Sequence, residues 1–141
     1  AIKMLYGHRR PGRRLTVLLV DDDADDLRRL QVLLGQDGRF EVVGGATSGG
    51  EGIELARIKR PDLALVDVRM DGLDGFQTAE RIVASLPVVR VVLISVTESR
   101  AYAEEARRVG ATFLPKSEIT ADAVYELGVR EMDGGAFQAR R

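Results

Sequence analysis

Two short apolar segments that each end in aspartate place the strongest constraint on what this sequence can fold into. They are residues 15–23, LTVLLVDDD, and residues 62–70, DLALVDVRM. Each apolar part is aliphatic and rich in β-branched residues, which is typical of a strand buried on both faces of a parallel sheet. Asp21, Asp22 and Asp67 are therefore expected where these strands leave the core. Open α/β sheets bind their ligands at that edge.

The sequence after Leu15 repeats one unit, in which a short apolar segment is followed by a polar turn and a segment of helical period. The apolar segments predict five strands, at residues 15–21, 40–45, 62–67, 89–95 and 111–115. Five helices are predicted to follow them, at residues 24–34, from Ser48 onward, and at 75–85, 100–109 and 120–132. Strands that alternate with helices form a parallel sheet with right-handed crossovers and helices on both faces.

This alternation predicts an α/β fold, a flavodoxin-like (βα)5 three-layer sandwich around a five-stranded parallel sheet. We expect the strand order 2-1-3-4-5, because it places the two acid-ending strands side by side at the switch point of the sheet. Adjacent parallel strands lie about 4.8 Å apart, so side chains at their ends can converge on one ion.

Local signals refine the first two helices. Asp23 is expected to cap the first helix, and Ser48 with Glu51 has the spacing of a capping box at the start of the second. The apolar residues predicted to form the buried face of the first helix are Leu27, Leu30, Val32, Leu33 and Leu34.

Length and composition fit one globular domain. The chain has 141 residues, of which 45% are hydrophobic and 30% charged, and no stretch approaches the roughly 18 apolar residues of a membrane span. There is no cysteine, which excludes disulfides, thiolate metal sites and cysteine nucleophiles. Because no secretory signal pattern opens the sequence, we expect a cytoplasmic protein without membrane contact.

The basic residues are unevenly distributed. Residues 1–14 contain five Lys or Arg and no acid, whereas the rest of the chain contains 16 bases and 22 acids. A basic arm can contact nucleic acid, but we expect residues 1–14 to be a flexible arm or an expression remnant. His8 lies in this arm and is not expected to be catalytic. The predicted domain covers residues 15–132, and 133–141 are expected to be a short tail or a truncated linker.

The three aspartates need a partner for their charge. Two unit negative charges about 4 Å apart repel by roughly 4 kcal/mol at an effective dielectric constant of ~20. Clustered carboxylates therefore take up protons or hold a cation. Oxygen donors without histidine or thiolate favour Mg²⁺, with Mn²⁺ or Ca²⁺ as alternatives. The competing interpretation, that Asp21 and Asp22 only cap a helix, does not account for Asp67.

Two further polar residues are expected at the same edge of the sheet. Ser95 ends the segment VVLIS and Lys116 follows the segment TFLP, so each comes directly after a buried strand. A hydroxyl and an ammonium beside an acid-bound cation can neutralise the three oxygens of a phosphoryl group, which is the main requirement of phosphoryl transfer.

With these landmarks the sequence resembles the receiver domain of two-component response regulators. The resemblance covers residues 15–132 and rests on five residues in order, with Gly75 and the GATFLPKS stretch fitting as well: Asp21, Asp22, Asp67, Ser95 and Lys116. The GATFLPKS stretch is similar to that of NarL/FixJ-type regulators. The resemblance implies the phosphoacceptor and the metal ligands. Asp67 would accept the phosphoryl group, Asp22 would bind Mg²⁺ directly, Asp21 would bind it directly or through water, and the backbone carbonyl of Arg69 would complete the set.

The same resemblance implies the remaining roles. Ser95 would hydrogen-bond the phosphoryl group and Lys116 would pair with it. Ser95 would then move toward the group while Phe113 turns inward, as the family's switch. The donor would be a phosphohistidine of a sensor histidine kinase, attacked by the Asp67 carboxylate.

The implied output is a DNA-binding domain absent from this chain, or a stand-alone receiver that acts by protein contact. DNA would be contacted only through such a domain. The family's usual output surface is the face formed by residues 100–109, 111–115 and 120–132, and a homodimer, if one forms, would use this face or another. The chain itself is expected to be a signalling domain that catalyses its own phosphorylation and slow dephosphorylation, and not a conventional enzyme.

Some positions depart from the common receiver pattern. Val96 stands where a smaller residue is usual, so we expect it to narrow access to the phosphoryl group and to slow both phosphotransfer and hydrolysis. Asp71 stands where proline is frequent. Ser117 replaces the usual proline after the lysine, and a cis bond before a residue other than proline costs about 3 kcal/mol.

Three other interpretations compete with this one. An EF-hand starting at Asp21 fails, because Asp26 and Val32 stand where glycine and glutamate are required. A haloacid dehalogenase-type phosphatase also begins with D-x-D, but the Gly-Thr that should follow and room for a cap domain are missing. A receiver whose phosphorylation site is intact but idle stays open as an alternative.

Overall fold

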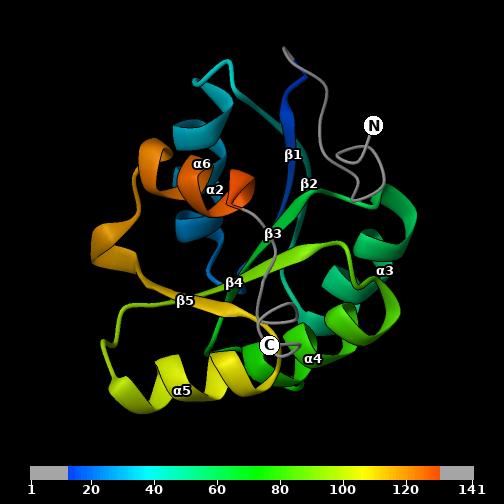
Figure 1. Ribbon diagram of the computed structural model, residues 1–141, viewed down its shortest axis with the longest axis vertical. Coiled ribbons are helices and arrows are strands. Elements are labelled where there is room, and N and C mark those ends of the chain that lie inside the picture. The colour runs from blue at the N-terminus through cyan, green and yellow to red at the C-terminus, as the bar shows by residue number, and fades with distance from the viewer. Residues whose placement is uncertain (1–12, 131–141) are drawn as a thin grey trace, which may run out of the picture.

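In the computed structural model, which describes residues 13–130, five parallel strands form one sheet in the order β2-β1-β3-β4-β5 (Figure 1). The predicted strand order and three-layer architecture are therefore confirmed. The strands are β1 (Leu15–Val20), β2 (Phe40–Ala46), β3 (Leu63–Asp67), β4 (Arg90–Ser95) and β5 (Thr112–Pro115). Each differs by at most one residue per end from its predicted range.

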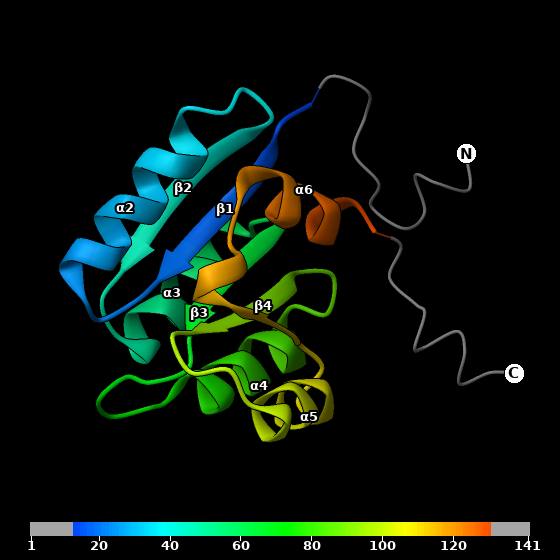
Figure 2. The same cartoon turned by 90° about the vertical axis from the view of Figure 1, so that its left-hand side faces the viewer.

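Within residues 13–130, five α-helices and one 3₁₀ turn connect and follow the strands. They are α2 (Ala24–Gly35), α3 (Gly49–Lys59), α4 (Gly75–Ser85), α5 (Arg100–Arg108), η1 (Lys116–Glu118) and α6 (Ala121–Val129). Helices α2 and α6 cover one face of the sheet, and α3, α4 and α5 cover the other (Figures 1 and 2). Right-handed crossovers between parallel strands account for this division.

Both faces of the sheet are buried, so the core has two halves. Side chains alternate along β1, with Leu18 and Val20 packing toward α3 and α4 and with Val17 and Leu19 packing toward α2 and α6. All four are fully buried. This is why β1 appears in the sequence as an unbroken apolar run and not as an alternating one.

The helix starts follow the sequence signals, with one correction. The Asp23 side chain caps α2 by accepting from the backbone N–H groups of Asp25 and Asp26, as predicted. Ser48 caps α3 by accepting from the Glu51 N–H at 3.2 Å. The predicted capping box is nevertheless incomplete.

A complete capping box also needs a hydrogen bond from the Ser48 backbone N–H to the Glu51 side chain, and here that bond comes from the preceding residue. The Glu51 carboxylate accepts at 3.0 Å from the backbone N–H of Thr47, not from that of Ser48. The helix with a full capping box is α4, between Asp74 and Gln77.

The prediction that Val32 lies on the buried face of α2 was wrong. Leu30 and Leu34 are buried because they lie one helical turn apart, whereas Val32, half a turn away, is exposed.

Some sequence predictions fall outside the described residues. These are the basic residues of the arm up to residue 12, with His8, and the tail at 133–141. The predicted last helix begins with Thr120 as its cap and is helical to Val129, while its expected end at residue 132 lies outside the described range. Between residues 13 and 130 no peptide bond is cis, which includes the bond between Lys116 and Ser117. No helix in this range is long and apolar enough to cross a membrane.

Candidate functional site

The residues singled out in the sequence lie together at the carboxyl edge of the sheet. Asp21 directly follows β1, Asp67 ends β3, Ser95 ends β4 and Lys116 directly follows β5. Parallel register aligns these ends, since Asp67 pairs with Ile94 on the neighbouring strand. The sheet topology therefore gathers side chains that are up to 95 residues apart in the sequence.

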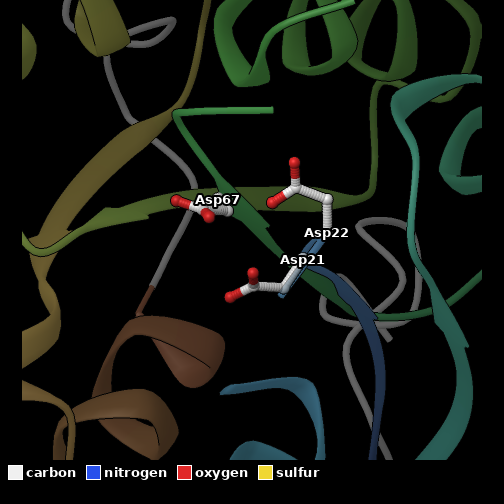
Figure 3. Close-up of side chains that lie close together, drawn as sticks. All are labelled: Asp21, Asp22 and Asp67. Carbon is white, nitrogen blue, oxygen red and sulfur yellow. The ribbon is translucent and has the colours of Figure 1, made fainter. Parts of the chain in front are cut away.

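Three carboxylates form the centre of this site. Asp21, Asp22 and Asp67 each offer one oxygen within 4.8 Å of the others. Figure 3 shows Asp21 and Asp22 at the end of β1 and Asp67 on the adjacent β3. Asp21 is fully buried and Asp67 nearly so, while Asp22 is exposed. The cluster thus has a buried inner side and an outer side that is open to solvent.

Backbone groups hold these aspartates in place. The Asp21 carboxylate accepts from the backbone N–H of Asp23 at 3.0 Å, and that of Asp67 accepts weakly from the N–H of Arg69 at 3.4 Å. Arg69 and Asp22 both line a hollow of about 390 Å³ at the outer side of the cluster. The backbone of Arg69, proposed from the sequence as a metal ligand, is therefore close to the carboxylates.

A glycine fixes the approach of α4 to the phosphoacceptor candidate. A Cβ atom at Gly75 would lie 2.3 Å from the backbone oxygen of Asp67 and 2.6 Å from the Cα of Val68. The Gly75 N–H donates to the Val68 carbonyl at 2.9 Å. Only glycine allows two backbones to come this close, so Gly75 sets the position of the loop that follows Asp67.

The Lys116 ammonium lies among carboxylates. Its Nζ donates to Asp21 at 2.9 Å and to Asp26 at 2.9 Å, and lies 3.7 Å from Asp67. Only 16% of the Lys116 side chain is exposed. One partly buried cation therefore only partly balances several acids, and excess negative charge remains at the centre of the site.

The pKa values reflect this excess. Burial, and then the charge of Asp21, raise the pKa of Asp67 to about 6. Burial alone would lower the pKa of Lys116, but hydrogen bonds to Asp26 and Asp21 outweigh it and hold that pKa above its usual range. The hydrogen bond from Lys116 lowers the pKa of Asp26. The site thus destabilises the charged form of Asp67 and stabilises that of Asp26.

Asp26 is a site residue that the sequence analysis missed. The sequence drew attention to it only as a mismatched position in an EF-hand loop. A usable signal was present, because Asp23 caps α2 and the third residue of that helix lies in its first turn, at the edge where β1 ends. What the sequence did not show is which residue of that turn faces Lys116.

The remaining predicted residues surround this centre. Ser95 is buried, and its hydroxyl oxygen accepts from the backbone N–H of Thr97 at 3.0 Å. Phe113 on β5 is partly buried and packs edge-to-face against Tyr102 of α5, with ring centroids 5.9 Å apart. Val96 is 76% exposed and borders a separate hollow of about 440 Å³, which Lys116 also lines.

The donor chemistry fits a hard divalent cation. Among residues 13–130 the three aspartates are the group of side chains able to hold a metal ion, and all their donors are carboxylate oxygens. Such donors suit Mg²⁺, which prefers oxygen ligands and keeps several waters. The raised pKa of Asp67 supports the same conclusion, because a cation would relieve the repulsion that contributes to it.

Known proteins with similar sequences show which family this domain belongs to. Residues 17–126 match the response regulator receiver domain family. A protein-glutamate methylesterase/protein-glutamine glutaminase from Pseudoalteromonas translucida is 40% identical over 102 residues, which are 71% of this chain and 26% of that protein. The transcriptional regulatory protein PdtaR of Mycobacterium tuberculosis is 37% identical over 95 residues, 67% of this chain and 45% of that protein. The chain thus spans between a quarter and a half of the length of these relatives.

A solved structure agrees with the sequence matches. The signal receiver domain of the response regulator NarL from Mycobacterium tuberculosis superimposes with a TM-score of 0.74 at 34% identity, covering 84% of this chain and 99% of that one. The family match covers most of the chain, and the acid-lined carboxyl edge lies within it. The chain therefore belongs to the response regulator receiver domain family.

Proposed function

We propose that this chain accepts a phosphoryl group on Asp67 from a sensor histidine kinase, with Mg²⁺ bound at the neighbouring acids. The observation that carries the proposal is the placement of Asp67, whose buried carboxylate lies within 4.8 Å of two other carboxylates and 3.7 Å from the Lys116 ammonium. A carboxylate with a raised pKa is the most nucleophilic of a cluster once a cation neutralises its neighbours.

In the proposed reaction an Asp67 carboxylate oxygen attacks phosphorus. The new O–P bond forms an acyl phosphate, and the P–N bond to the kinase histidine breaks with its electron pair returning to the imidazole nitrogen. Asp22 would hold Mg²⁺ directly, Asp21 directly or through water, and the Arg69 carbonyl would add a ligand. Bound Mg²⁺ would neutralise phosphoryl charge, and Mn²⁺ would suit the same oxygen donors.

Two residues would hold the phosphoryl oxygens. Lys116 already lies beside Asp67, and a modest shift would bring its ammonium into hydrogen-bond range. The Ser95 hydroxyl oxygen accepts from Thr97, which leaves its proton for donation to the phosphoryl group. Movement of Ser95 would open space for Phe113, whose ring at present packs against Tyr102. This is the switch we propose for the face formed by α5, β5 and α6, where a homodimer would form.

The output remains part of the proposal. Similarity to the NarL receiver domain and to a transcriptional regulatory protein favours a DNA-binding output domain outside this chain, and 40% identity to a methylesterase favours an enzymatic one. A receiver that signals by contact alone, in the cytoplasm, is the alternative. Determining the length of the native reading frame would separate these cases.

The test is phosphorylation by a small donor. Wild-type protein and Asp67→Asn are incubated with acetyl phosphate and Mg²⁺, and intact mass is measured. We expect wild type to gain one phosphoryl group, about 80 Da, which Asp67→Asn and a chelator-treated sample do not gain. A wild type that gains no mass, or an equal gain in Asp67→Asn, would refute the proposal.

A further inference from the structure

Asp26 connects α2 to the centre of the site. It is the third residue of α2, and its two carboxylate oxygens have different partners. One oxygen pairs with Arg29 on the next turn, and the other accepts from Lys116 at 2.9 Å. Its side chain is 27% exposed, compared with 73% for Asp25 beside it. Asp26 is thus directed toward the sheet edge, whereas Asp25 is directed toward solvent.

The contacts of Lys116 show what Asp26 does to it. An ammonium has three N–H donors, and Asp21 and Asp26 accept two of them at 2.9 Å each. Asp67 lies 3.7 Å away, which is an ion-pair distance but longer than a hydrogen bond. The shortest contacts of Lys116 are therefore made with residues other than the phosphoacceptor.

From this geometry we propose that Asp26 is a positioning residue that restrains Lys116 toward α2 and so slows phosphorylation of Asp67. The inference rests on the proposed phosphotransfer function. The incoming phosphoryl group carries negative charge that must attract the Lys116 ammonium. Asp26 competes for the same ammonium, and Arg29 keeps Asp26 in place. Loss of the Asp26 charge removes the competitor without changing any residue that contacts the phosphoryl group.

The chain offers a matched control for this proposal. Asp25 and Asp26 both lie in the first turn of α2, and each pairs with an arginine three residues later. Substitution of either by asparagine removes the same charge from the same helix terminus. Only Asp26 contacts Lys116, so a difference between the two variants reports that contact.

The experiment measures the rate of phosphorylation by acetyl phosphate at saturating Mg²⁺, followed by intact mass. We expect Asp26→Asn to be phosphorylated about fivefold faster than wild type, as suits the loss of one partly exposed ion pair. Asp25→Asn and Asp26→Glu should keep the wild-type rate, the latter because a glutamate still provides a carboxylate for Lys116. Hydrogen exchange of the Lys116 ammonium, measured by nitrogen-15 NMR, should be faster in Asp26→Asn alone.

These outcomes separate the two proposals. A wild type that is never phosphorylated refutes the phosphotransfer function, and the exchange measurement then still tests the Asp26 contact. A normally phosphorylated wild type, with Asp26→Asn no faster than Asp25→Asn, refutes the restraint alone. Unchanged ammonium exchange in Asp26→Asn also refutes it. Circular dichroism confirms that each variant is folded before rates are compared.

Discussion

Two clusters in this molecule place one base among aspartates, at opposite edges of the sheet. Just before β2, Arg39 pairs with Asp37 at 2.8 Å and Asp122 at 2.9 Å, and its guanidinium lies 4.5 Å from the centroid of the Tyr125 ring. At the carboxyl edge, Lys116 lies among Asp21, Asp26 and Asp67. The same kinds of side chain thus form a surface clamp between β2 and α6 in one place and a candidate reactive site in the other.

The difference lies in burial and in how closely the acids lie to one another. Hydrogen bonds from Arg39 lower the pKa of the partly exposed Asp37 carboxyl to about 2, so the Arg39 cluster is stable when fully charged. Burial and the charge of Asp21 raise the pKa of Asp67 to about 6. An ion cluster therefore stabilises the fold where its acids are at least partly exposed and each is hydrogen-bonded to the base. It becomes reactive where the acids are buried and repel one another, as Asp21 and Asp67 do.

The largest expected effect is a loss of stability when a side chain is added to the glycine beside the carboxylate cluster, compared with the glycine beside Arg39. Gly75→Ala would place a Cβ 2.3 Å from the Asp67 carbonyl oxygen, and a neighbouring backbone cannot yield easily. We expect a loss of about 3 kcal/mol in the free energy of unfolding, measured by urea denaturation. A Cβ atom at Gly38, next to Arg39, would meet no atom within 4 Å, so Gly38→Ala should change stability by about 1 kcal/mol at most. Similar losses of unfolding free energy in the two variants would contradict the expectation that the backbone is packed more closely at the carboxyl edge than beside Arg39.

A second prediction is that replacing an aspartate by asparagine changes the free energy of unfolding in opposite directions in the two clusters. Asp67→Asn should raise the free energy of unfolding at pH 7 without Mg²⁺ by about 2 kcal/mol, a value discounted from the roughly 3 kcal/mol that its pKa shift represents. Asp37→Asn should lower it, because Arg39 loses its partner. Urea denaturation of the two variants checks this. Stabilisation by both, or by neither, would show that the clusters do not differ as described.

The pH dependence follows from the same shifts. The folded state of the wild type binds more protons at Asp67 than the unfolded state does between about pH 4 and 6, so this residue makes stability fall as pH rises through that window. For Asp37 the lowered pKa provides stability that is present above about pH 4 and is lost as pH falls toward about 2. The free energy of unfolding is measured against pH for Asp67→Asn and Asp37→Asn. Each variant should lack the slope that its replaced aspartate causes in the wild type.

A third prediction is that Mg²⁺ acts at one cluster only. At ten times its dissociation constant the ion should stabilise the folded protein by about 1.4 kcal/mol, measured as a thermal shift that a chelator reverses. Asp22→Asn should reduce this shift, because Asp22 belongs to the carboxylate cluster. Asp37→Asn should retain it in full. Equal shifts in the two variants would mean that the ion binds elsewhere.

The sequence predicted the elements that depend on short-range pattern. The strands were found because both faces of the sheet are buried, which makes them apolar runs, and the strand order followed from the two runs that end in acid. The predicted site residues Asp21, Asp67, Ser95 and Lys116 lie together because strand topology fixes where strand ends meet. Their chemical roles remain predictions.

The contacts that sequence reasoning missed depend on how a helix is rotated about its axis, or join residues that are far apart in the sequence. Whether Asp25 or Asp26 reaches Lys116 is decided by the rotation of one helical turn, which a run of polar residues does not report. The pairing of Arg39 with Asp122 joins residues 83 positions apart, through a loop and a helix that show no shared pattern. Val32 was misassigned for the first reason, since adjacent apolar residues hide which side of a helix is buried.

The smallest expected effect concerns an exposed valine at the site edge. Val96 is 76% exposed and borders the hollow that Lys116 and Asp26 also line. Val96→Ala removes two methyl groups from the approach to Lys116, so phosphorylation and decay should both become about threefold faster, a change of less than about 1 kcal/mol in each barrier. Stability should change by less than about 0.5 kcal/mol.

Val88 is the matched control for this effect. It is 72% exposed in the turn before β4, at the edge opposite the site, so Val88→Ala removes the same groups from an equally exposed position. Its rates should equal those of wild type. If Val96→Ala also leaves both rates unchanged, the valine does not control access, and the Asp26 contact with Lys116 is then the one proposed control on the phosphorylation rate that remains to be tested.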